Sequence, residues 1–119
     1  MEIGKKVWVI ADGYMNHTQK GNFESHEAVC VLNVSGKAAQ IEITVYFEDQ
    51  DPISGFRAVC ENNRTNHIRL DKITNDIGEK IPYEKPYALL IKSDVPIVVQ
   101  HSRMDVSQPE MTLMTTIAY

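Results

Sequence analysis

The chain has 119 residues and a formal net charge of −4; 43% of the residues are hydrophobic and 24% are charged. This length and balance are typical of one globular domain with its own core, and they exclude a disordered tail or a disulfide-stapled miniprotein. The negative net charge argues against non-specific binding to nucleic acid, which needs many cationic side chains to neutralise phosphates, and we expect no specific DNA binding either.

Most periodic segments of the chain have the two-residue period of β-strands. The clearest spans residues 41–47, where Ile41, Ile43 and Val45 alternate with more polar residues. We predict strands at residues 7–11, 24–34, 41–47, 56–61, 64–70, 87–92, 96–103 and 110–119.

Turn-forming residues are expected to separate these strands. Asp12-Gly13-Tyr14 predicts a turn after the first strand, residues 16–22 a loop, and Ser93-Asp94 a turn before the strand at 96–103. Residues 71–86 contain two prolines and a glycine, which exclude a long helix. About eight short strands with frequent turns predict an all-β fold: a single-domain antiparallel β-sandwich, jelly-roll-like, over residues 1–119.

Two of the predicted strands carry a His-x-Arg triplet, His67-Ile68-Arg69 and His101-Ser102-Arg103. Strand residues two apart share a face, so each triplet points an imidazole and a guanidinium the same way. We expect both pairs to converge, together with His26 and Glu27, on one patch open to water. Arginine offers a fork that suits carboxylates and phosphates. The patch therefore predicts a site for a sugar, an organic anion or an acidic partner.

Other interpretations of these residues stay open. The histidines and arginines would also serve as strand-end polar groups paired with Glu24, Glu27, Glu42 or Asp105. A metal centre of three histidines is disfavoured, because an arginine stands where a second histidine ligand would be. No nucleophile elbow, phosphate loop or dinucleotide motif occurs. We therefore predict a protein that is not an enzyme and needs no metal or cofactor.

The compartment and the assembly also leave signals in the sequence. The apolar run that follows Lys6 is too short for a signal peptide or a membrane span, so we expect a cytoplasmic protein. Cys30 and Cys60 are then expected to pack as small hydrophobic residues. Residues 28–32 and 88–91 are apolar on both strand faces, which favours a homo-oligomer.

Several stretches, in their order and spacing, resemble the sensory rhodopsin transducer family. These are Ala11-Asp12-Gly13-Tyr14, the segment from Ser25 to Asn33, Ile43-Thr44-Val45-Tyr46-Phe47, the segment from Arg64 to Arg69, the segment from Ser93 to Arg103, and Thr116-Ile117-Ala118-Tyr119. The resemblance covers nearly the whole chain. Residues 15–23, 49–56 and 71–86 do not match.

The resemblance implies a cytoplasmic β-sandwich that assembles as a homotetramer. It also implies a soluble signalling partner of a microbial sensory rhodopsin, and a fold similar to that of carbohydrate-binding sandwiches. Two hypotheses follow. The first is a non-enzymatic signalling adaptor that binds a membrane-protein partner and a small ligand. The second is a binding module for a sugar or organic anion that uses His26, Glu27, His67, Arg69, His101 and Arg103.

Overall fold

The computed structural model describes residues 2–108 and 110–119, and within them it contains nine β-strands and no helix. Every strand pairing is antiparallel. This confirms the predicted all-β class. The strands are β1 (Lys5–Gly13), β2 (Gln19–Lys20), β3 (Phe23–Glu24), β4 (His26–Asn33), β5 (Ala39–Phe47), β6 (Ile53–Cys60), β7 (Arg64–Arg69), β8 (Tyr87–Asp105) and β9 (Thr112–Ile117).

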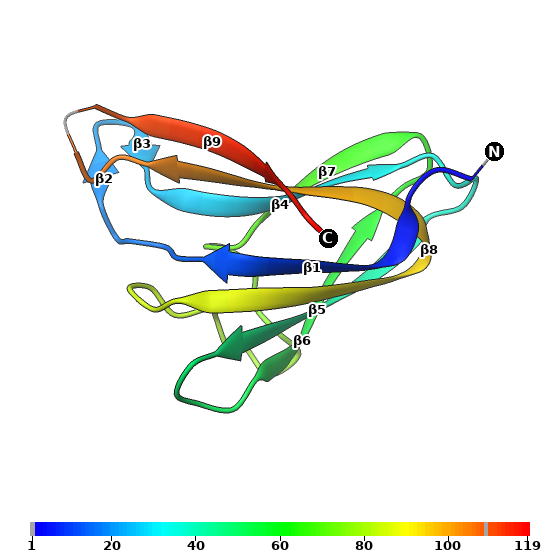
Figure 1. Cartoon of the computed structure of the whole chain (residues 1–119), viewed down its shortest axis with the longest axis horizontal. Helices are drawn as coiled ribbons and strands as arrows, with labels where there is room; N and C mark the ends of the chain where they lie inside the picture. Colours follow the sequence, from blue (N-terminus) through cyan, green and yellow to red (C-terminus); the bar gives the residue numbers. More distant parts are fainter. Residues whose placement is uncertain (1, 109) are drawn as a thin grey trace.

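The long strand β8 belongs to two layers at once. Along its first half it pairs with β5 on one side and β1 on the other, and β6 pairs with β5. Along its second half it pairs with β4 and β9, and β7 pairs with β4. One seven-stranded sheet therefore folds over at β8 into a sandwich (Figure 1). We call β6-β5-β8-β1 the first layer and β7-β4-β8-β9 the second layer.

The predicted turn at Ser93-Asp94 was wrong, because β8 continues through it. Ser93 is buried and pairs with Ile41, while the Asp94 carboxylate accepts a hydrogen bond from the backbone N–H of Gln40 at 2.8 Å. These polar groups mark the point where β8 leaves the first layer. Pro96 lies between the part of β8 that pairs with β5 and the part that pairs with β4. The missing backbone N–H of a proline costs little there.

Burial alternates strictly along β8, from Tyr87 through the bend to His101. The face of β8 that is turned inward is therefore the same in both layers, and its side chains form the middle of the core. The predicted alternation of β5 is confirmed, since Ile41, Ile43 and Val45 are all buried. The largest other side chains of the core that are fully buried are Met15, Val29, Val31, Phe56, Leu70, Leu89, Ile91, Ile97 and Val99.

The edges of the two layers meet on one side of the sandwich, where β1 and β9 approach each other (Figure 1). The backbone of Tyr119, just beyond β9, exchanges two hydrogen bonds with the backbone of Val9 in β1. Between Ile10 and Gly13, β1 carries one more residue than the facing part of β8, which is a β-bulge at Ala11 and Asp12. The turn predicted at residues 12–14 is thus the bulged end of β1.

Candidate functional site

The two His-x-Arg pairs do not converge, which corrects the sequence-based expectation. His67 of β7 lies opposite Cys30 of β4, whereas His101 of β8 lies opposite Val29. Cross-strand partners point to the same side of a sheet, and neighbours along one strand point to opposite sides. His67 and Arg69 are therefore on the outer face of the second layer, turned away from the first layer. His101 and Arg103 point inward.

The outer face holds three of the six predicted site residues: His26, His67 and Arg69. Arg69 is paired with two acids, because its Nε and Nη2 donate to Asp71 at 2.8 Å and Nη2 also donates to Glu24 at 2.9 Å. The Nδ1 atom of His26 lies 2.9 Å from the carbonyl oxygen of Glu24. His67 is exposed. The ion-pair interpretation of these residues is correct for Arg69.

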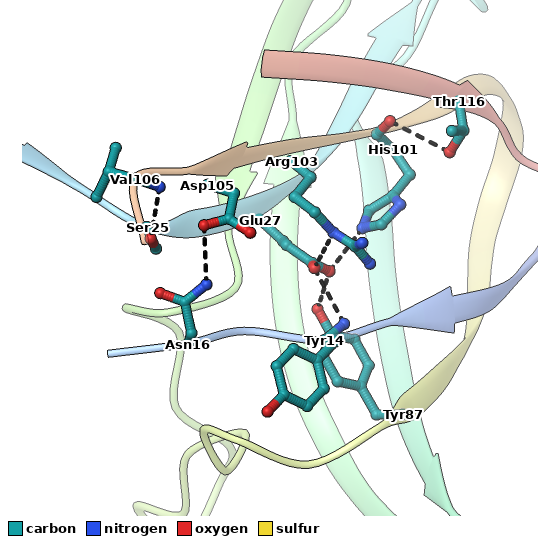
Figure 2. A network of polar contacts seen from close by, with 10 residues as sticks. All are labelled: Tyr14, Asn16, Ser25, Glu27, Tyr87, His101, Arg103, Asp105, Val106 and Thr116. Atoms are coloured by element: carbon teal, nitrogen blue, oxygen red, sulfur yellow. Dashed lines mark hydrogen bonds and ion pairs between the residues drawn. The ribbon is translucent and has the colours of Figure 1, made fainter. Parts of the chain in front are cut away.

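The other three predicted residues meet inside the sandwich, where the Glu27 carboxylate is fully buried. Its Oε1 accepts hydrogen bonds from His101 Nε2 at 2.8 Å and from the Tyr87 hydroxyl at 2.5 Å. Its Oε2 accepts from Arg103 Nε at 2.7 Å and from the backbone N–H of Tyr14 at 3.0 Å. Figure 2 shows these four donors arranged around the one carboxylate, which we call the Glu27 network.

The fold of β8 explains why this network forms. Tyr87 and His101 lie at opposite ends of the inward face of β8, about 46 Å apart along a straight strand at roughly 3.3 Å per residue. Because β8 folds over, both side chains reach Glu27 from opposite layers. Gly13 is part of this arrangement, since a Cβ there would lie 2.4 Å from the Tyr87 ring.

Sequence reasoning missed Tyr87 and the backbone of Tyr14 as partners of Glu27. The only signal in the sequence was the glycine of Asp12-Gly13-Tyr14, which reads as a turn residue but serves close packing against Tyr87. The bulge in β1 places Gly13 opposite Tyr87 and leaves the N–H of Tyr14 directed at Glu27. Local sequence does not reveal either contact.

The Glu27 network keeps its buried carboxylate ionised. Burial alone would raise the pKa of Glu27, but the hydrogen bonds donated to it and the positive charge of Arg103 outweigh burial and hold that pKa below its ordinary value. The pKa of the Tyr87 hydroxyl is raised, by burial first and then by the charge of Glu27. A carboxylate can only accept hydrogen bonds, so the proton between His101 and Glu27 is carried by Nε2 of the histidine.

A cleft of about 510 Å³ opens on the Glu27 network, between β1 and β9. His101 and Arg103 lie at its floor, the bulged residues Ala11 and Asp12 at one rim, and β9 at the other. Arg103 reaches both the network and this cleft, because its Nε donates to Glu27 while 25% of its side chain is exposed. The arrangement can present a held guanidinium to a molecule that enters the cleft.

Three further observations bear on the chemistry of the site. Within residues 2–108 and 110–119, no group of three or more His, Cys, Asp or Glu side chains is placed to hold a metal ion. In the same residues no helix has the length and apolar character needed to cross a membrane. Both cysteines are free thiols; Cys60 lies in the core and Cys30 is half-buried on the outer face.

Two four-stranded layers that share one folded strand, with a charged network buried between them, define a small β-sandwich protein without a helix in its described part. The sequence profile described as Anabaena sensory rhodopsin transducer matches residues 3–119. The chain therefore belongs to the sensory rhodopsin transducer family, as its motifs predicted.

Solved structures support the same assignment. The crystal structure of Thermotoga maritima 1070 has a TM-score of 0.87 and 39% identity, over 98% of this chain and 94% of that one. The structure of the Anabaena sensory rhodopsin transducer has a TM-score of 0.77 and 39% identity, over 92% of this chain and 96% of that one. No protein with a curated description matches the sequence.

Proposed function

We propose that this protein is a non-enzymatic signalling adaptor that acts in the cytoplasm as a homotetramer and binds a sensory-rhodopsin-like membrane protein. Membership of the transducer family supports this role. The observation that carries the proposal is an apolar surface on the outer face of the second layer, where a single copy of the chain leaves large hydrophobic side chains in water.

The exposed large hydrophobic side chains on this outer face include Leu32, Leu113 and Ile117, at 44%, 68% and 70% exposure. Leu113 lies opposite Met104, whose partner on the other side is His26. Exposed apolar residues gathered beside polar rims are typical of protein interfaces. The outer-face residues His26, His67 and Arg69 would then border a contact between protein surfaces.

The tetramer is tested by light scattering on the purified protein. We expect the wild-type mass to be four times that of the chain, and the double variant Leu113→Asp with Ile117→Asp to be monomeric, because two charges cannot be buried there without partners. Val59→Asp is the matched control, since Val59 is as exposed as Leu32 but lies in β6 of the first layer. A monomeric wild type would contradict the assembly.

The adaptor role is tested with a microbial sensory rhodopsin in detergent micelles, titrated in the dark and under illumination. We expect saturable binding whose affinity changes with light. The tetramer-deficient variant should bind more weakly than Val59→Asp if binding needs the assembled surface. The absence of binding in both light and dark would contradict this partner, whatever the oligomeric state.

A second candidate function, binding of a sugar or organic anion, is favoured by a different observation: Arg103 and His101 line the cleft between β1 and β9. A cleft of this volume lies within the ordinary range for small-molecule sites. A thermal-shift screen of neutral sugars and organic acids tests it. No shift with any compound would count against this function, and it would leave the adaptor role unaffected.

A further inference from the structure

The guanidinium of Arg103 lies in the cleft between β1 and β9, and only part of its hydrogen-bonding capacity is satisfied by described residues. Arg103 donates to Glu27 through Nε, and no described residue hydrogen-bonds its outer nitrogens, Nη1 and Nη2. Figure 2 shows these two nitrogens turned away from Glu27. Arg69 differs, because Asp71 and Glu24 occupy its Nε and Nη2, and Asp76 and Glu42 engage all three nitrogens of the exposed Arg57.

The Glu27 network holds Arg103 ready for a ligand. Glu27 receives three other hydrogen bonds, from Tyr14, Tyr87 and His101, so its charge does not depend on the outer nitrogens of Arg103. The Nε contact fixes the guanidinium plane, and a plane fixed in advance loses less entropy when it binds. The free edge offers two parallel N–H groups, the geometry that a carboxylate accepts in bidentate fashion.

The rest of the cleft restricts what the carboxylate can be attached to. At one rim the bulge in β1 displays Asp12, which is exposed and accepts hydrogen bonds from hydroxyl or ammonium groups. At the other rim β9 contributes Met114 and Thr116, an apolar wall and a hydroxyl. Bulges commonly redirect a side chain beside a binding site. A second carboxylate on the ligand would meet the like charge of Asp12.

From these contacts we infer that the cleft binds a small organic monocarboxylate bearing hydroxyl groups, with its carboxylate on Nη1 and Nη2 of Arg103 and its hydroxyls toward Asp12 and Thr116. This inference rests on the second proposed function and specifies its ligand class. A sugar acid has the required groups, and the cleft volume of about 510 Å³ accommodates a six-carbon one.

Calorimetry with D-glucuronate, succinate and D-glucose tests the assignment on the full chain. We expect glucuronate to bind the wild type, and Arg103→Gln to weaken binding roughly tenfold or more, because charge-assisted hydrogen bonds are lost. Arg57→Gln is the matched control and should bind normally. Asp12→Asn should improve succinate binding by roughly fivefold through the loss of a like charge at an exposed rim.

Two measurements keep the test decisive if Arg103→Gln folds poorly. Arg103→Lys keeps the charge but cannot offer two parallel N–H groups, so it should also lose glucuronate. In the unmodified protein, glucuronate should shift the amide NMR signals of residues 10–12 and 114–117 before any others.

The outcomes distinguish failure of this inference from failure of the second candidate function, the binding of a sugar or organic anion. Failure of glucuronate to bind the wild type, or equal binding by Arg103→Gln, overturns the inference. Glucose that binds as tightly as glucuronate, without dependence on Arg103, also overturns it but leaves a sugar-binding function intact. If no compound in the wider screen binds either, both the inference and the second function fall.

Discussion

The outer pair His67/Arg69 and the inner pair His101/Arg103 share a local sequence pattern but have opposite environments. Arg69 lies on the outer face with its Nε and Nη2 taken by Asp71 and Glu24. Arg103 points into the sandwich, shares Glu27 with His101 and keeps two donors for the cleft. The same triplet is thus a surface ion pair in one strand and part of a buried network in the other.

The difference follows from which residue of β4 each histidine faces. Cys30 and Val29 are neighbours, and neighbours in a strand project to opposite sides. A shift of one residue in the β4–β7 pairing would turn His67 and Arg69 inward, and a shift of one residue in the β4–β8 pairing would turn His101 and Arg103 outward. The comparison teaches that a strand motif acquires its chemistry from the register of the strand beside it, and the following predictions test how far the two pairs differ.

The largest expected effect is at the acid beneath the inner pair. Glu27→Gln removes a buried charge that Arg103 and His101 rely on, and breaking a buried pair in this way typically costs about 3 to 5 kcal/mol. Glu24→Gln, at the half-exposed acid beside Arg69, should cost no more than about 1 kcal/mol. Urea denaturation measures both free energies of unfolding. Equal losses would remove the distinction between the two pairs.

Substitution of His101 should likewise lower the free energy of unfolding more than substitution of His67. His101→Ala removes a buried hydrogen bond to a charged group, which is worth about 1.5 to 3 kcal/mol. His67 is exposed, and surface substitutions usually change the free energy of unfolding by no more than about 0.5 kcal/mol. The same denaturation curves test this prediction. A loss at His67 as large as that at His101 would contradict the difference between the two pairs.

A smaller effect is expected where β1 meets the inner pair. In Gly13→Ala the added Cβ would lie 2.4 Å from the Tyr87 ring, so the ring must shift from the position in which its hydroxyl contacts Glu27. Crowding of this kind typically costs about 1 to 3 kcal/mol. Gly36→Ala is a control in which the added Cβ has open space, so that its loss of stability comes from the backbone alone, whose φ of 103° strains a non-glycine residue. Tyr87 hydroxyl protection in NMR exchange experiments would fall in the first variant only.

The smallest effect is a change in acid sensitivity. The pKa of Glu27 is lowered from 4.5 despite burial, which alone would raise it, so the folded state binds fewer protons than the unfolded state just below pH 4.5. The stability from Glu27 is therefore complete above about pH 4.5 and is lost as pH falls through the lowered pKa.

A comparison of the wild type with Glu27→Gln shows how much of the stability lost at low pH is due to Glu27. Asp71, beside Arg69, also has a lowered pKa, because the hydrogen bonds and charge of Arg69 outweigh its burial. In Glu27→Gln the free energy of unfolding should fall less steeply with decreasing pH below 4.5, while the part due to Asp71 remains. Unfolding midpoints measured between pH 3 and pH 6 on both proteins check this. Identical slopes would show that Glu27 titrates normally.

Local sequence was sufficient for the family and for most of the strands, though not for the continuous course of β8. The alternation of Ile41, Ile43 and Val45 is a property of a single strand, and burial on one face follows from it directly. The turn at Asn63 is equally local, because its φ of 58° is a conformation that asparagine tolerates. Such features depend on neighbours within a few residues, so they can be read from the chain alone.

The site was decided by contacts between distant residues. Which of His101 and His67 faces inward depends on the register of each strand with β4. Ser93-Asp94 continues a strand because β5 lies beside it, and Asp94 accepts a hydrogen bond from the backbone N–H of Gln40 there. Periodicity in the sequence reports on a single strand, so it reveals neither the register between strands nor a hydrogen-bond partner many residues away. All six predicted residues lie in strands, but only the folding of β8 over the core determined that His101 and Arg103 share the carboxylate of Glu27.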